Sequence, residues 1–365
     1  MYVENAIDIV IPSFRLDEDT LIKIINVDQP LNFKINFYII ADNPAIAVPE
    51  SILKLAENGT INLVKNEKNL GFSKTRNKGI TLGKSKWLLL LDDDITPEKT
   101  LLIAYANAIA KNHDAIGFAG VTNFPKPFNS TTLALEVNGD TGHCKSAGQY
   151  AELMWVPTTN IMLNRESMDP SLFNENLKKG GEDIEFLVRN ALLNNKKYIG
   201  VPDAIVAHPW WPGGTTKRLF RYGAGAAQIA SLPAIKKYTY HNFTNTAETL
   251  LLLILCSPLI VINFSWGVLI EMVLILVGVE FVINCFRSVY LIKKFSLGVA
   301  VNLFWIKNCY EVGYLMESLL KGRLSGFGER VDMAFTRENP SWFRLNKWKM
   351  LKVTFLLILF TIILL

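Results

Sequence analysis

The stretch that decides the fold is LLLLDDDITP, Leu88 to Pro97. Four consecutive leucines are too few to cross a membrane and are typical of a strand buried on both faces, as in a parallel sheet covered by helices. Three adjacent carboxylates repel one another, so a core strand that ends there favours a bound cation. Ligands of open α/β sheets bind beyond the carboxyl ends of the strands. The stretch predicts a divalent-metal site at the tip of a central strand, with a solvated acidic turn as the alternative.

Strand and helix patterns alternate on both sides of this stretch. We predict strands at 7–12, 35–41, 61–64, 87–91, 116–121 and 198–206, and helices at 17–28, 50–58, 73–82, 100–111, 180–194 and 216–229. This alternation implies an α/β fold with a doubly wound, mostly parallel sheet. Residues 124–150 are rich in Pro, Asn, Thr and Gly and show weak periodicity. We predict that they form an irregular loop that orders over substrate.

The composition indicates two domains in the 365 residues. Half of the residues are hydrophobic, and the excess lies after Ala247, so we expect a globular domain over 1–240 and a membrane-associated helical domain over 241–365. The four cysteines have no metal-ligand spacing and favour a reducing compartment over a disulfide framework. Since residues 1–8 run directly into the first strand, no signal peptide is expected.

The second domain has the pattern of a multi-pass membrane segment. Residues 249–270 contain no charge, and a helix over 247–286 would be about 60 Å long, so we predict a hairpin of two spans there. An interfacial helix over 295–320, a basic loop over 321–350 and a terminal span over 351–365 follow. Because basic loops stay on the cytoplasmic side, this topology predicts an inner-membrane protein whose first domain is cytoplasmic.

Four motifs together resemble a known family. In order and spacing the chain is similar to inverting family 2 glycosyltransferases with a GT-A fold and a membrane-embedded tail, and the resemblance covers about residues 7–230. The motifs are Val10-Ile11-Pro12-Ser13, Asn69-Leu70-Gly71 through Arg76-Asn77-Lys78-Gly79, Leu91-Asp92-Asp93-Asp94 and Gly181-Glu182-Asp183. The resemblance implies that the first domain is catalytic and binds a nucleotide-sugar donor.

The resemblance also implies which residues line the donor site. Asp42 would accept from the base, Gly71 would let the backbone approach the nucleotide, and Arg76 would place a fixed cation near the diphosphate. A solvated helix charge is the alternative for Arg76. Arg218 and Arg221 would contact the diphosphate or an anionic lipid headgroup. The full donor-binding set is Pro12, Ser13, Arg15, Asp42, Gly71, Arg76, Asp93, Arg218 and Arg221.

A metal ion and a general base complete the implied site. Asp92 and Asp94 would hold Mg²⁺ or Mn²⁺, which offsets the charge that grows on the leaving nucleotide. His208 is a third candidate ligand, although a structural role is the alternative. Asp183 would take the proton from the acceptor hydroxyl, with Glu182 as the competing candidate and a helix-capping role as the alternative.

The resemblance is compatible with several functions, which differ mainly in the molecule that accepts the sugar. The chain lacks a Gln-x-x-Arg-Trp motif, which processive members of the family carry, so we expect a single sugar addition to a lipid-linked or other glycan acceptor in cell-envelope polysaccharide biosynthesis. Transfer to a polyprenyl phosphate is the alternative, and its anionic nucleophile would need no base. Nucleotidyl transfer and a non-enzymatic scaffold are weaker alternatives. We expect membrane lipids as partners and no nucleic acid.

Overall fold

The computed structural model describes residues 2–211, 215–338, 343–344 and 346–365. These residues form two compact units. The first consists of residues 1–126, 141–178 and 182–210, and the second of residues 127–140, 179–181 and 211–365. Part of the expected basic loop over 321–350 lies outside the described residues.

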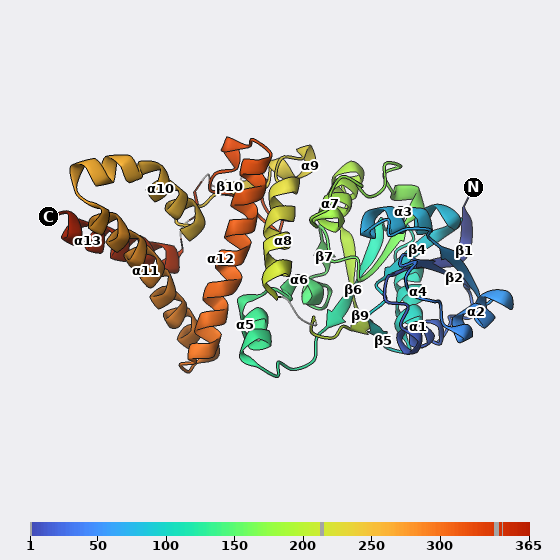
Figure 1. The fold of residues 1–365 in the computed structure, drawn as a ribbon. Coiled ribbons are helices and arrows are strands. Elements are labelled where there is room, and N and C mark those ends of the chain that lie inside the picture. Colours follow the sequence, from blue (N-terminus) through green and yellow to red (C-terminus); the bar gives the residue numbers. More distant parts are fainter. Residues whose placement is uncertain (1, 212–214, 339–342, 345) are drawn as a thin grey trace. The chain divides into compact units, whose positions relative to one another are not determined.

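A nine-stranded mixed sheet forms the centre of the first unit, in the order β3-β2-β1-β4-β8-β6-β9-β5, with β7 paired to β9 (Figure 1). The pairs β1-β2, β2-β3, β1-β4 and β6-β9 are parallel, whereas β8 runs antiparallel to both of its neighbours. The prediction of an α/β, mostly parallel sheet is confirmed. The strands are β1 (Val3–Ser13), β2 (Lys34–Ala41), β3 (Ile61–Lys65), β4 (Ser85–Leu91), β5 (Thr96–Pro97), β6 (Gly117–Asn123), β7 (Glu152–Leu153), β8 (Asn160–Asn164) and β9 (Tyr198–Ala207).

The strand β4 lies in the middle of the sheet, as its leucines indicate. Leu88 and Leu89 are fully buried, and Leu90 and Leu91 are each 1% exposed. A strand with helices on both faces has no polar side, which explains the unbroken apolar run. The helices of this unit are α1 (Glu18–Ile25), α2 (Glu50–Glu57), α3 (Phe72–Leu82), α4 (Leu101–Lys111), α6 (Gly142–Lys145) and α7 (Glu182–Asn194), with short 3-10 turns at Ser146–Gly148 and Arg165–Ser167.

A buried ion pair connects β1 to the 3-10 turn after β8. Arg165 Nη2 lies 3.0 Å from Asp8 Oδ2, and both side chains are almost fully buried. The main-chain and side-chain donors of Ser85 also bond the Asp8 carboxylate, at 2.9 and 2.6 Å. Because removing one partner of such a pair leaves a buried charge, the pair constrains how β1, β4 and the turn fit together.

The prediction of an irregular loop over 124–150 is wrong. The segment contains α5 (Ser130–Asn138), α6 and a 3-10 turn. Asn129 and Thr132 form a capping box at the start of α5, and Gly139 ends the helix with φ 88°. Within the second unit α5 packs on α12 (Leu297–Leu320), where Thr131 Oγ1 donates to Asn302 Oδ1 at 2.9 Å. Packing against a distant segment stabilises a helix whose own periodicity is weak.

The second unit is mostly helical. In addition to α5 and α12 it contains α8 (Thr215–Ile229), α9 (Pro233–Lys236), α10 (Thr246–Asn263), α11 (Trp266–Ile292), α13 (Lys347–Leu364), a 3-10 turn at Leu324–Gly326, and the antiparallel pair β10 (Thr239–His241) and β11 (Glu329–Val331). The helices α8 and α12 pack so closely that a Cβ at Gly313 would lie only 2.1 Å from the Phe220 carbonyl oxygen. The absence of a side chain at Gly313 permits this approach.

Two helices among the described residues, α10 and α11, are long and apolar enough to cross a membrane. Their mean hydropathies are 1.9 and 2.3. They are separated by a short break at Ser265, whose side chain accepts a hydrogen bond from the Val268 main chain and caps α11. The helix α13 is not one of the two; its first two turns contain Lys347, Lys349 and Lys352.

Candidate functional site

Asp93 joins the carboxyl ends of β1 and β4 in the first unit. Ser13, the last residue of β1, donates its hydroxyl to Asp93 Oδ2 at 2.9 Å. The main-chain nitrogens of Phe14 and Arg15 donate to the same oxygen at 2.9 and 3.0 Å, and the Arg15 guanidinium bonds the other oxygen. Asp93 is 4% exposed, and its carboxylate stabilises the turn that follows β1. This turn includes the predicted donor-binding residues Ser13 and Arg15. Pro12 precedes this turn and pairs with Ile40 of β2.

Asp94 and His208 form a pair at the same edge of the sheet. Asp94 Oδ1 lies 3.3 Å from His208 Nε2, and Asp94 Oδ2 lies 2.8 Å from Arg15 Nη2. Burial lowers the pKa of His208, but the neighbouring Asp94 carboxylate outweighs it and leaves that pKa above its usual value. His208 Nδ1 lies 2.6 Å from the Pro209 carbonyl oxygen, so each ring nitrogen faces a hydrogen-bond acceptor, which is the arrangement that favours the protonated ring.

Arg76 bridges the acidic turn after β4 and the first turn of α7. Its Nη2 donates to Asp92 Oδ1 and its Nη1 to Glu182 Oε1, both at 3.0 Å. Arg76 is only 8% exposed, so the alternative of a solvated helix charge is excluded. The side chain is brought to this depth because α3 approaches β1 closely at Gly79, where a Cβ would lie 2.4 Å from Val10 Cγ1.

One contact of this network involves a residue that sequence reasoning missed. Thr159 Oγ1 donates to Asp92 Oδ2 at 2.9 Å, so both oxygens of Asp92 have partners. Thr159 lies just before β8, and no motif in the sequence marks it. The antiparallel insertion of β8 beside β4 brings it to the acidic turn.

Glu182 and Asp183 begin α7, and both are held in a poorly solvated environment. Burial raises the pKa of Glu182 to about 7, and repulsion from Asp183 adds to that effect while Arg76 opposes it. Burial also raises the pKa of Asp183, against a hydrogen bond of 2.8 Å from the Ile184 main-chain nitrogen to its Oδ1. Carboxylates that have raised pKa values and lie beside charged partners are candidates for proton transfer.

Asp42 stabilises the turn that precedes α3 through hydrogen bonds. It follows β2 and accepts hydrogen bonds from the Leu70 and Gly71 main-chain nitrogens at 2.8 and 3.0 Å and from Asn66 Nδ2 at 2.8 Å. Gly71 has φ 81°, a conformation that favours glycine. Asp42 therefore positions the Gly71 backbone that we expect to approach the nucleotide.

Arg218 and Arg221 lie on α8, which belongs to the second unit. The Arg218 guanidinium stacks 4.7 Å from the centre of the Trp211 ring, and its Nη1 donates to the Tyr222 hydroxyl at 3.3 Å. The other predicted site residues belong to the first unit.

Few of the described side chains are placed to act as metal ligands. The described part of the chain holds no group of three or more His, Cys, Asp and Glu side chains arranged for a metal ion. Asp94 and His208 nevertheless form an adjacent oxygen and nitrogen pair. Mg²⁺ usually takes only one or two protein carboxylates and completes its shell with phosphate oxygens and water, so this pair fits an ion that arrives with a diphosphate.

Residues 8–169 match the model of the family described as "Glycosyl transferase family 2". No curated protein matches the sequence significantly. Among solved structures, the mannosyltransferase PcManGT from Pyrobaculum calidifontis in complex with GDP-Man and Mn²⁺ is 16% identical with a TM-score of 0.47, over 61% of this chain and 62% of that one. The match therefore covers less than two thirds of that mannosyltransferase.

Two further structures are similar at the same level. The S. aureus TarS fragment 1–349 is 14% identical with a TM-score of 0.45, over 87% of this chain and 92% of the fragment. GalNAc-T7 with UDP, GalNAc and Mn²⁺ is 16% identical with a TM-score of 0.46, over 64% of this chain and 49% of that chain.

Proposed function

Because residues 8–169 match the model of glycosyl transferase family 2, we propose that the chain transfers one sugar from a nucleotide-diphosphate donor to a hydroxyl of a lipid-linked or other glycan acceptor. The observation that carries the proposal is the bridge made by Arg76. It ties Asp92 at the tip of β4 to Glu182 at the start of α7, beside Asp183. A charged edge of the sheet and a poorly solvated base are thereby combined in one site.

The proposed reaction is a single displacement. Asp183 takes the proton of the acceptor hydroxyl while that oxygen forms a bond to the anomeric carbon of the sugar. The bond from this carbon to the diphosphate oxygen breaks, and its electron pair leaves with the nucleoside diphosphate. The raised pKa of Asp183 suits this role, because a general base works best when its pKa is near the working pH.

The donor is proposed to lie across the carboxyl ends of β1 and β4. The turn shaped by Asp93, with Ser13 and Arg15, and the Gly71 backbone would contact the nucleotide. Asp94 and His208 would hold Mg²⁺ or Mn²⁺, with Asp92 near it. When bound, such an ion offsets the negative charge that develops on the leaving diphosphate.

As the pH is lowered, the enzyme should lose activity at a higher pH than is usual for an enzyme with a carboxylate base. Asp183 must be deprotonated to accept a proton, and burial raises the pKa of Asp183 and that of Glu182, the latter to about 7, in the presence of Arg76 and Asp92. The rate should therefore begin to fall at a pH above the value of about 4 at which an ordinary aspartate titrates. We would measure kcat against pH; a plateau that extends unchanged to pH 5 would contradict this role for the pair.

Membrane attachment through the second unit is part of the proposal. The apolar helices α10 and α11 support it, and an inner-membrane location with a cytoplasmic catalytic domain would give the site access to sugar nucleotides. Such a location also brings a lipid-linked acceptor within reach.

A panel of sugar nucleotides tests the function. The full chain would be incubated with Mn²⁺, membrane lipid extract and each donor in turn, and the released nucleotide would be identified by chromatography. Release of a nucleoside diphosphate from one donor is expected. Release of pyrophosphate would instead identify a nucleotidyl transferase, and no release from any donor would contradict the proposal.

A further inference from the structure

A cavity of about 330 Å³, with several charged side chains in its lining, lies within the second unit. Asn245, which precedes α10, and Asn346, which caps α13, both line it, so both helices begin at the cavity. The residues of α11 that line it, Glu280, Ile283 and Arg287, come from the C-terminal half of that helix. The cavity therefore lies at the end of the bundle where α10 and α13 start.

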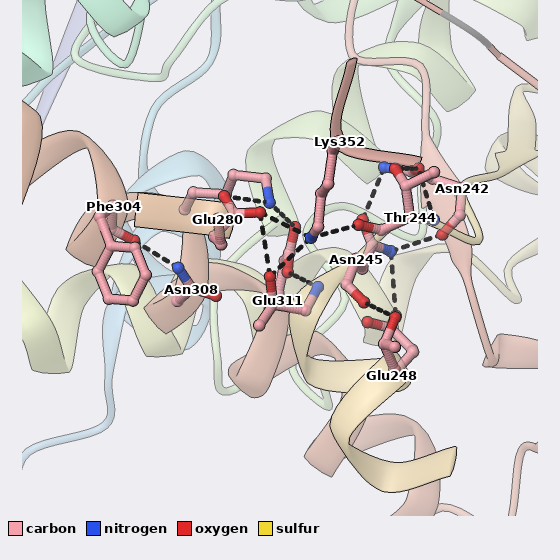
Figure 2. Close-up of polar contacts among 12 residues, drawn as sticks. Asn242, Thr244, Asn245, Glu248, Glu280, Phe304, Asn308, Glu311 and Lys352 are labelled. Atoms are coloured by element: carbon pink, nitrogen blue, oxygen red, sulfur yellow. Dashed lines mark hydrogen bonds and ion pairs between the residues drawn. The ribbon is translucent and has the colours of Figure 1, made fainter. Parts of the chain in front are cut away.

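Most carboxylates around this cavity are already neutralised by a lysine or arginine. Lys307 Nζ lies 2.8 Å from Glu280 and 3.0 Å from Glu311, and Lys352 Nζ lies 2.6 Å from Glu280. Arg330 pairs with Glu248 at 2.8 Å. Figure 2 shows Glu280, Glu311 and Lys352 pointing toward one another beside the Asn245 and Glu248 side chains. This network fixes the starts of α10 and α13 against α11 and α12.

Two further cations of the lining bond neutral oxygens. Arg287 donates to the Asn284 and Asn138 side-chain oxygens at 3.0 and 2.7 Å. Lys349 donates to the Arg344 carbonyl oxygen at 2.7 Å. Among the residues described in the structure, neither Arg287 nor Lys349 forms an ion pair. Of the described carboxylates that line the cavity, only Asp140 also lacks an ion pair. Five cations, Arg287, Lys307, Arg330, Lys349 and Lys352, line the cavity against the three carboxylates Asp140, Glu280 and Glu311, so the lining has a surplus of positive charge.

The other end of this helix bundle is apolar inside and outside. Leu253 of α10 and Leu276 of α11 are buried together, and Phe360 of α13 packs on the same cluster. The outward surfaces of α10 and α11 expose large apolar side chains, including Leu255, Leu259, Ile262, Trp266, Ile270 and Leu274. A large exposed apolar surface of this kind is typical of contact with lipid chains. A cationic cavity at one end of such an apolar surface complements a lipid that has an anionic headgroup and a hydrocarbon chain.

We propose that this cavity binds the phosphate headgroup of a membrane lipid, whose hydrocarbon chain lies along the apolar surface of α10 and α11. Arg287 and Lys349 are the residues assigned to the phosphate. A phosphate oxygen accepts charge-assisted hydrogen bonds from guanidinium and ammonium groups, which are stronger than the bonds that these groups make to neutral oxygens. The aromatic residues Trp348 and Tyr310 also line the cavity and suit the level of lipid headgroups.

Dodecyl phosphate is the probe that tests the site. The full chain would be held in dodecyl maltoside micelles and titrated with dodecyl phosphate by calorimetry. Saturable binding to one site is expected, and Lys349→Gln should weaken it about tenfold, the change expected when one charge-assisted hydrogen bond is lost. Lys349→Arg, which keeps the charge, should retain most of the affinity.

Lys347→Gln is the matched control. Lys347 lies in the same turn of α13 but is exposed, stacks over Tyr290 and does not line the cavity, so its removal should leave the affinity unchanged. An equal loss in both variants, or no saturable binding to the unchanged chain, would overturn the proposal. Inorganic phosphate bound as tightly as dodecyl phosphate would overturn the assignment to a lipid. Competition by phosphatidylglycerol would support the site and identify a bulk phospholipid as its occupant.

Discussion

Asp183→Asn is expected to lower kcat by about 10²–10⁴-fold and to leave donor affinity nearly unchanged. The amide keeps the shape of the side chain and can still accept from the Ile184 nitrogen, but it cannot take a proton from the acceptor. Turnover would be measured as nucleoside diphosphate release at saturating donor and acceptor, and donor affinity by calorimetry.

Glu182→Gln is the comparison for this variant, because Glu182 is the competing candidate for the base. Glu182 already accepts a hydrogen bond from Arg76, which stabilises its charged form, so we expect a smaller loss of kcat than for Asp183→Asn. The reverse order would make Glu182 the base. Turnover of Asp183→Asn at the rate of the unchanged chain would contradict a base in this helix and favour an acceptor that is already an anion, such as a polyprenyl phosphate.

Asp94→Ala is expected to abolish the metal-dependent part of donor binding. Asp94 is the carboxylate paired with His208, and the two side chains are the proposed protein ligands of the ion. In Mn²⁺ buffer the variant should bind the donor at least tenfold more weakly than the unchanged chain, and no better than the unchanged chain does with a chelator. Calorimetric titration of the donor with and without Mn²⁺ measures both quantities.

Asp203→Ala provides the control for Asp94→Ala. Asp203 is an exposed carboxylate on β9, in the same unit, and its removal should not alter donor affinity. If Asp94→Ala bound the donor normally and retained its response to Mn²⁺, the proposed metal ligand would be wrong.

The central sheet was predictable from the sequence because each strand has a local signature. The leucines before Asp92 are buried on both faces, and the helix α1 buries Leu21, Ile24 and Ile25 on the face that their spacing predicts. The start of α1 was also predictable, since Asp17 accepts a hydrogen bond from the Thr20 main chain. Local propensity and tertiary packing agree in these elements.

The helix α5 could not be predicted in the same way. Its sequence has weak periodicity, and its packing partner, α12, follows more than 150 residues later in the chain. The buried pair of Asp8 and Arg165 is a similar case, because nothing local to either residue indicates the other. Contacts between distant segments decide both features.

The site was predictable in its residue types but not in its connections. The acidic turn after β4 and the carboxylates that begin α7 stand out in the sequence, but the bridge that Arg76 makes between them does not. Asp42 and Asp93 also bond main-chain nitrogens of neighbouring turns, contacts that depend on the register of β1, β2 and β4. Thr159 enters the site only because β8 inserts antiparallel between β4 and β6.

The configuration of the anomeric carbon in the product is the measurement that tests the central claim most directly. A single displacement with Asp183 as base converts an α-linked sugar nucleotide into a β-linked product. The anomeric proton of the first product formed would be assigned by NMR, with the donor identified from the panel. A linkage of the configuration opposite to that of the donor, β from an α-linked donor, is the predicted result. An α linkage from an α-linked donor would contradict the account, because retention requires a different course of reaction.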